Sequence, residues 1–177
     1  MNVAIAGEGP NELGGWAKRE PYRRKDEPGV IEALLRLIKG EGWTITRATL
    51  WRDVRKYRIN PPVSAETHTV RVLALDAQES GCDLLVFVRD ADHDALRSSQ
   101  IEDGLSEAAR PCKSLTVVGG VPVPCLEGWL LAIAGTSKAE ELRKKRAVTA
   151  LEELGVDAKD TTAMVEHVRR YGILHVP

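Results

Sequence analysis

The chain has 177 residues, of which 43% are hydrophobic and 29% charged, and its formal net charge is −1. These values are typical of one globular domain with a hydrophobic core, and they exclude a disordered or collagen-like chain. No apolar run approaches the roughly 20 residues of a membrane-spanning helix, and the N-terminus lacks the basic segment of a signal peptide, so we expect a cytoplasmic protein without membrane contact. The three cysteines form no C-x-x-C pair, which argues against a disulfide framework and a zinc site. We expect them to be buried as small apolar residues.

Short apolar runs rich in β-branched residues predict four buried strands. In chain order they cover residues 3–6, 44–51, 84–88 and 115–118, and Gly119-Gly120 is expected to follow the last strand as a turn. Apolar residues at helical spacing predict helices between and after these strands. They cover residues 30–38, 66–79, 101–109, a segment after Pro124, 137–154 and 161–171, with Ser98 and Ser99 as caps of the third.

The alternation of strands and helices predicts an α/β fold. Parallel neighbours need a crossover connection, so we expect a Rossmann-like parallel sheet of about four strands with helices on both faces. The helices of residues 137–177 are expected to form a C-terminal extension packed on one domain that spans residues 1–177. Two long loops, 10–29 and 52–64, leave the carboxyl ends of strands, where sheets of this class bind ligands.

The near-zero net charge conceals two regions of opposite sign. Residues 16–60 hold twelve Lys and Arg against six Asp and Glu, a charge of +6. Residues 61–110 hold four Lys and Arg against ten Asp and Glu, a charge of −6. Such a division is informative about binding partners, and a function for this chain should use both regions.

Acidic residues follow the first and the third predicted strand. Glu8 comes after the first strand, and Asp90 and Asp92 follow the third. Because the carboxyl ends of parallel strands meet at one edge of a sheet, we expect these three carboxylates to converge. Mg²⁺ and Mn²⁺ prefer oxygen ligands, and a carboxylate beside a bound metal can act as a general acid or base. The alternative for Asp90 and Asp92 is that they cap the helix that follows.

Single positions exclude several other motifs. An EF-hand loop that began at Asp90 would need Gly where Ala95 stands and Glu where Ile101 stands. A dinucleotide-binding fingerprint that began at Gly7 would need Gly where Glu12 stands, and no G-x-x-x-x-G-K-[ST] P-loop occurs. Nucleotide binding by these routes is therefore not expected.

Three short motifs occur in order along the first three quarters of the chain. They read Glu8-Gly9-Pro10-Asn11-Glu12, Asp90-Ala91-Asp92 and Glu127-Gly128-Trp129-Leu130-Leu131-Ala132. The combination resembles the Toprim domain of topoisomerases, bacterial primases, small RNA-maturation nucleases and the nucleases of the overcoming-lysogenization-defect family. It is most similar to small stand-alone bacterial Toprim-like proteins. The chain lacks the tyrosine-bearing cleavage domain of topoisomerases and the zinc-binding or template-binding region of primases, which leaves hydrolytic cutting of nucleic acid.

The resemblance implies a role for each acidic residue. Glu8 would serve as general acid/base, and Asp90 and Asp92 would hold Mg²⁺ or Mn²⁺ for phosphodiester chemistry, so these three are the expected catalytic residues. The expected metal-binding cluster comprises Glu8, Asp90, Asp92, Asp94, Glu12 and Glu127. Glu127 has an equally good alternative role, because an acidic residue in the first turn of a helix compensates the helix dipole.

The two basic loops predict a nucleic-acid interface around this cluster. Lys and Arg make most phosphate contacts, and aromatic side chains can stack on unpaired bases. The expected nucleic-acid-binding residues are Lys18, Arg19, Arg23, Arg24, Arg52, Arg55, Lys56 and Arg58, with Trp16, Tyr22, Trp51 and Tyr57 between them. The alternative is a pair of solvated loops with Trp51 in the core. Lys144-Lys145-Arg146, in contrast, are interpreted as the solvated face of a helix that also carries glutamates.

These observations predict a metal-dependent nuclease, or a related phosphodiester-processing enzyme, that acts on DNA or RNA. The resemblance also suggests a role in anti-phage defence. One alternative is a non-catalytic Toprim-like module that partners an ATPase. Another is a nucleotide-sugar transferase that uses Asp-x-Asp to hold a metal on a pyrophosphate, but then Glu8 would have no role.

Overall fold

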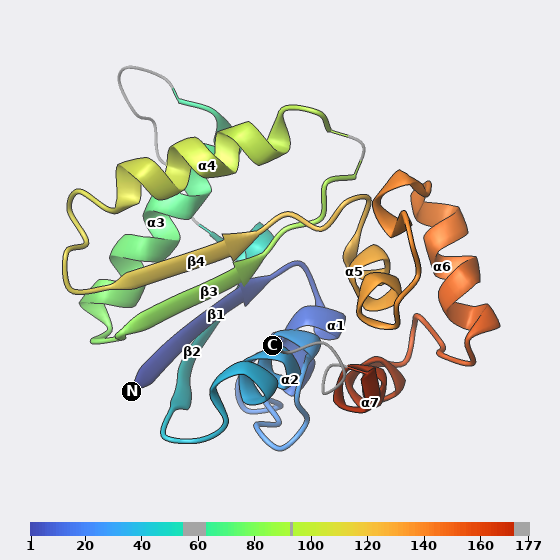
Figure 1. Ribbon diagram of the computed structural model, residues 1–177. Coiled ribbons are helices and arrows are strands. Elements are labelled where there is room, and N and C mark those ends of the chain that lie inside the picture. The colour runs from blue at the N-terminus through green and yellow to red at the C-terminus, as the bar shows by residue number, and fades with distance from the viewer. Residues whose placement is uncertain (55–62, 93, 172–177) are drawn as a thin grey trace. The chain divides into compact units, whose positions relative to one another are not determined.

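The computed structural model describes residues 1–54, 63–92 and 94–171 (Figure 1). The chain forms two compact units, each of which is described by itself. The first, which we call the sheet unit, comprises Met1–Glu8, Gly42–Arg89 and Asp94–Gly120. The second, the helical unit, comprises Gly9–Glu41, Asp90–His93 and Val121–Pro177.

The sheet unit is built on four parallel strands in the order β2-β1-β3-β4. The strands are β1 (Asn2–Gly7), β2 (Thr44–Leu50), β3 (Leu84–Val88) and β4 (Thr116–Gly120). The central strands are the most apolar, and Val3, Ile5, Leu85 and Phe87 are almost completely buried. The predicted Rossmann-like α/β fold with a four-stranded parallel sheet is confirmed.

Two helices of the sheet unit, α3 (Ala65–Glu79) and α4 (Arg97–Ala108), lie side by side on one face of the sheet (Figure 1). Ser64 caps α3 by accepting a hydrogen bond from the backbone N–H of Thr67 at 3.0 Å. Close packing of the two helices depends on Gly104, because a Cβ there would lie 2.8 Å from the Cβ of Val70. A larger residue at position 104 would therefore push α3 and α4 apart.

Helices make up the regular structure of the helical unit. They are α1 (Pro10–Leu13), α2 (Val30–Lys39), α5 (Leu126–Ile133), α6 (Lys144–Glu153) and α7 (Thr161–Tyr171). Helix α5 packs against α6 and α7, and α2 packs against α7. Leu130, Leu131, Leu151 and Met164 are fully buried in this unit, so its core comes from one apolar face of each helix.

Several predicted boundaries are wrong. The helix expected over residues 137–154 is two elements, a 3-10 turn at Ala139–Glu141 and α6, because Leu142 and Arg143 have extended backbone. Helix α4 begins at Arg97, so Ser98 and Ser99 lie inside it; Asp94 stabilises the turn before the helix by accepting a hydrogen bond from the N–H of Leu96. The expected loop of residues 10–29 begins with α1 and a 3-10 turn at Gly14–Ala17.

The predicted turn at Gly119-Gly120 belongs instead to strand β4. A Cβ on Gly119 would lie 2.0 Å from the ring of Phe87, so the ring occupies the space of a side chain. Glycine is therefore required here for packing and not for a turn.

Within the described ranges, no helix is long and apolar enough to cross a membrane. All three cysteines are free and buried, as predicted.

We expect Gly119→Ala to destabilise the sheet unit by about 1–3 kcal/mol, because the added methyl group displaces the buried Phe87 ring. Urea unfolding followed by circular dichroism measures this as a lower midpoint. Val118→Ala, on the same strand with half of its side chain exposed, is the matched control and should change stability by less than about 0.5 kcal/mol. Equal midpoints for Gly119→Ala and wild type would contradict the packing argument.

Candidate functional site

Two of the predicted catalytic carboxylates, Asp90 and Asp92, meet at one ammonium group in the helical unit. The Nζ of Lys144 lies 3.1 Å from Oδ2 of Asp90 and 2.7 Å from Oδ1 of Asp92. Asp90 is 6% exposed, and its other oxygen accepts a hydrogen bond of 2.9 Å from the N–H of Leu126. The arrangement places two carboxylate oxygens on a single cation.

The backbone after β3 fixes these two carboxylates. The N–H of Ala91 donates to the carbonyl of Pro122 at 3.0 Å, and that of Asp92 donates to the carbonyl of Pro124 at 3.3 Å. Asp92 then has φ 48°, in the left-handed region that few residues other than Gly, Asn and Asp adopt. Such a conformation, held by neighbouring hydrogen bonds, is frequent at functional sites.

Lys144 is the first residue of α6, where a positive charge is intrinsically unfavourable. Lys145 and Arg146 follow it, so the first turn carries three cations and no acidic residue at the positive end of the helix dipole. Burial would lower the pKa of Lys144, but hydrogen bonds to Asp92 and Asp90 outweigh it and raise that pKa above its ordinary value. The two aspartates therefore compensate a charge that the helix itself disfavours.

Helix α5 contributes a third carboxylate, Glu127, in its first turn. Glu127 is 9% exposed, and its Oε2 has no hydrogen-bond partner among the described residues. Burial and a hydrogen bond with Glu127 raise the pKa of the neighbouring Cys125 to about 12, so this thiol stays protonated at neutral pH and is a poor nucleophile. The helix-dipole role and the ligand role predicted for Glu127 are both compatible with this position.

In the sheet unit, Glu8 belongs to a second network of ion pairs. Its carboxylate pairs with Arg89, which also bonds Glu66 at 3.1 Å. Glu66 receives further contacts from Arg97 at 3.2 Å and from the indole N–H of Trp51 at 2.9 Å. Burial would lower the pKa of Arg89, but the hydrogen bond to Glu66 and the charge of Glu8 raise it.

The structure brings together some of the predicted acidic residues and assigns others local roles. Asp90 and Asp92 share a cation, whereas Glu8 belongs to the other unit, so its convergence with them stays a prediction. Glu12 accepts a hydrogen bond from the N–H of Gly9 at 2.9 Å and caps α1. Asp94 caps the turn before α4. Within the described part of the chain, no group of three or more His, Cys, Asp or Glu side chains is arranged to hold a metal ion.

The first basic loop presents its cations around one glutamate. Lys18 and Arg24 pair with Glu27 at 3.0 and 2.9 Å, which lowers the pKa of Glu27 below its ordinary value. Arg23 lies over the ring of Trp16, 5.4 Å from its centroid.

Two of the aromatic residues of the basic loops are buried. Trp16 is buried in the helical unit, and Trp51 is buried against Phe87 in the sheet unit, so neither is available to stack on a base. Tyr22, in contrast, is 76% exposed. Arg19 and Arg52 are exposed as expected, and Arg55, Lys56, Tyr57 and Arg58 lie outside the described residues.

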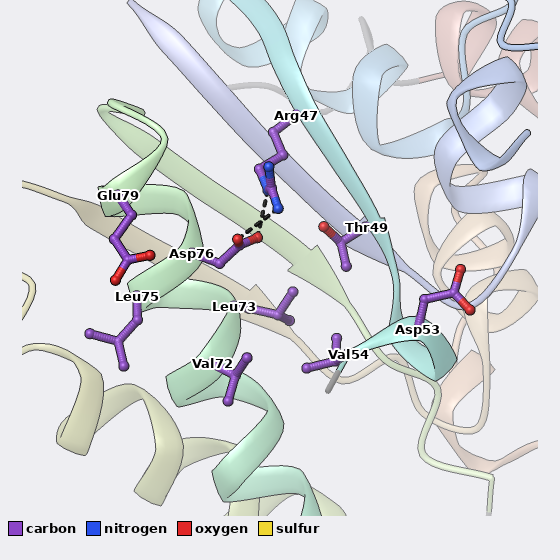
Figure 2. Close-up of a pocket in the computed structure, with 9 residues that line it drawn as sticks. All are labelled: Arg47, Thr49, Asp53, Val54, Val72, Leu73, Leu75, Asp76 and Glu79. Carbon is purple, nitrogen blue, oxygen red and sulfur yellow. Dashed lines mark hydrogen bonds and ion pairs between the residues drawn. The ribbon is translucent and has the colours of Figure 1, made fainter. Parts of the chain in front are cut away.

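The sheet unit also contains a cavity of about 530 Å³ between β2 and α3 (Figure 2). Arg47 and Asp76 form a bidentate ion pair across it at 2.5 and 2.6 Å, and Val54, Val72 and Leu73 supply apolar wall. None of the predicted site residues lines this cavity.

Sequence reasoning missed Lys144, Glu66 and Arg89. Lys144 did leave a signal, since three cations at the start of a helix need an acidic partner. The predicted helix start at residue 137 concealed it by placing these cations in mid-helix. Glu66 and Arg89 carry no local signal, because their contacts join α3 to the end of β3.

Comparison of the chain with protein-family models, with curated proteins and with solved structures finds no match.

We expect Glu66→Gln to destabilise the protein by about 2 kcal/mol, since it removes the charge of the carboxylate that Arg89 and Arg97, both largely buried, share. Thermal unfolding measures the loss, and Trp51 fluorescence should shift because the indole N–H loses its carboxylate acceptor.

Glu107→Gln is the matched control, because the pair of Glu107 with Arg71 is about one-third exposed and should contribute less than about 1 kcal/mol. Equal losses of stability from the two substitutions would show that the ion pairs of Glu66 contribute no more than an exposed pair.

Proposed function

We propose that the protein is a Mg²⁺- or Mn²⁺-dependent phosphodiester-processing enzyme, a nuclease that acts on DNA or RNA. The observation that carries this proposal is the convergence of Asp90 and Asp92 on one cation. The motifs that resemble the Toprim domain support it, because they assign a metal to the same two residues.

The donor atoms fit a hard divalent cation. Oδ2 of Asp90 and Oδ1 of Asp92 already face one positive charge, and the N–H of Leu126 occupies the remaining oxygen of Asp90. Buried Glu127 offers a further oxygen without a hydrogen-bond partner among the described residues. Mg²⁺ usually binds through one or two carboxylates and keeps several waters, so this donor set is sufficient. A bound Mg²⁺ would polarise a phosphate oxygen and offset its charge.

Residues of the chain would carry out the proton transfer and the orientation that hydrolysis also requires. In hydrolysis a water oxygen bonds to phosphorus and the P–O ester bond breaks. The attacking water loses a proton, and the leaving oxygen gains one from solvent water. Glu8, whose carboxylate pairs with Arg89 in the sheet unit, is the residue to which the Toprim resemblance assigns the acceptance of the water's proton. Asp90, fixed by Leu126, orients the site without moving a proton.

The first basic loop is the proposed phosphate-binding surface. Lys18, Arg23 and Arg24 supply charge, and exposed Tyr22 supplies an aromatic face beside them. Lys18, Arg24 and Tyr22 are exposed, and cations beside an accessible aromatic ring are what binding of an unpaired nucleic-acid strand requires.

We place this activity in the cytoplasm. Three free, buried cysteines agree with a reducing compartment.

We expect Asp90→Asn and Asp92→Asn each to lower Mn²⁺-dependent cleavage of a labelled oligonucleotide by more than about 100-fold, since even outer-shell changes at metal sites cost 10–100-fold. Single-turnover assays with single-stranded and duplex DNA and RNA make the measurement. Asp103→Asn, an exposed carboxylate on α4, is the control and should cleave like wild type. Wild-type protein that cleaves none of the four substrates with either metal would refute the proposed activity.

We expect the double substitution Lys18→Ala/Arg24→Ala to weaken oligonucleotide binding and to reduce the slope of log K against log salt by about 1–2, since each lost phosphate contact removes about 1 from the slope. Fluorescence anisotropy at several salt concentrations measures both quantities.

Lys138→Ala removes an exposed cation elsewhere in the same unit and should leave the slope unchanged. An unchanged slope in the double variant would show that the loop does not bind phosphate.

A further inference from the structure

The position that the proposed function assigns to a metal is taken by a side chain of the protein. The ammonium of Lys144 contacts both Asp90 and Asp92, and it is the atom on which their oxygens converge. The side chain of Lys144 is 42% exposed, so the ammonium reaches the site from the protein surface. One cation is therefore supplied by the chain itself.

The neighbouring cations of α6 are placed differently, which makes Lys144 specific. Lys145 is exposed, and Arg146 pairs with Glu153 at 2.8 Å. Three adjacent cations thus have three separate environments, and Lys144 alone among them contacts the aspartates. A general electrostatic attraction between α6 and the two aspartates would not favour Lys144 over Lys145 and Arg146.

The two cations cannot share the site. A divalent ion bound by Oδ2 of Asp90 and Oδ1 of Asp92 would stand where the ammonium stands, and two positive charges at that separation repel strongly. Binding of the ion must therefore release Lys144. The free energy needed to break the ion pairs of Lys144 with Asp90 and Asp92 then reduces the binding free energy of the ion. The same holds for any ligand whose binding-competent state is only partly populated.

We propose that Lys144 is a tethered competitor that occupies the divalent-cation site and sets the metal affinity of the protein. The inference rests on the proposed function, because it needs Asp90 and Asp92 to bind a metal. In the metal-free protein Lys144 offsets part of the negative charge of the two carboxylates and contacts them from the first turn of α6. When a divalent ion binds, the ammonium leaves, and the affinity is lower than the bare carboxylates would provide.

The test is the affinity for Mn²⁺ alone, measured by the electron paramagnetic resonance signal of the free ion, without substrate or turnover. Lys144→Met removes the charge and keeps the apolar stem, and we expect it to bind Mn²⁺ about tenfold or more tightly than wild type. Lys145→Met, one position along the same helix, should bind like wild type. Lys144→Arg retains a cation and should also bind weakly. Thermal unfolding of each variant verifies that it is folded before titration.

The outcomes separate the inference from the proposed function. If Lys144→Met binds Mn²⁺ with wild-type affinity, or less tightly, the ammonium is not a competitor and the inference is overturned, while the metal site stands. If Lys145→Met gains as much affinity as Lys144→Met, general electrostatics explain the result and the inference is again overturned. If folded wild type and Lys144→Met both fail to bind Mn²⁺, the proposed metal site itself is refuted.

Discussion

Charge compensation of carboxylates at the ends of strands is the interaction on which both units depend. Glu8 follows β1, and Asp90 and Asp92 follow β3. Asp90 is buried, which makes an unpaired carboxylate costly there, and Glu8 and Asp92 are partly exposed. In each unit, a cation from a distant part of the sequence pairs with these carboxylates. Arg89 pairs with Glu8 in the sheet unit, and Lys144 pairs with Asp90 and Asp92 in the helical unit.

This compensation changes the interpretation of the regional charges. A basic region of +6 and an acidic region of −6 suggested a basic rim around an acidic centre. Inside the acidic region, however, Glu66 is neutralised by Arg89 and Arg97, which belong to that same region. Asp90 and Asp92 take their partner from the C-terminal third of the chain. The basic loop consequently retains cations at the surface, among them Lys18 and Arg24, which share Glu27.

The fold was predictable from the sequence to the extent that it follows from periodicity. Strand β3 was predicted to the residue and helices α2 and α3 to within one, because apolar spacing is a local property. Gly119 was misread, since its requirement comes from the Phe87 ring on a neighbouring strand. For the candidate site, Asp90 and Asp92 were predicted from their place after a strand, and the structure brings both to Lys144. Lys144 was not recognised, because it lies 54 positions from Asp90 and its helix start was misplaced.

Arg89 and Asp90 are consecutive residues with opposite charges, and each belongs to a different network of ion pairs. Arg89 is the cation for Glu8 and Glu66, and Asp90 is an anion for Lys144. The Arg89-Asp90 pair at the end of β3 therefore contributes one charge to the ion pairs of Glu8 and Glu66 and one to the ion pair of Lys144. A substitution that removes Asp90 leaves Lys144 at the positive end of α6 without its buried partner, whereas one that removes Arg89 leaves Glu8 and Glu66 to repel each other. The two losses therefore differ in the sign of the charge that loses its partner: the first leaves excess positive charge at the start of α6, and the second leaves excess negative charge on Glu8 and Glu66.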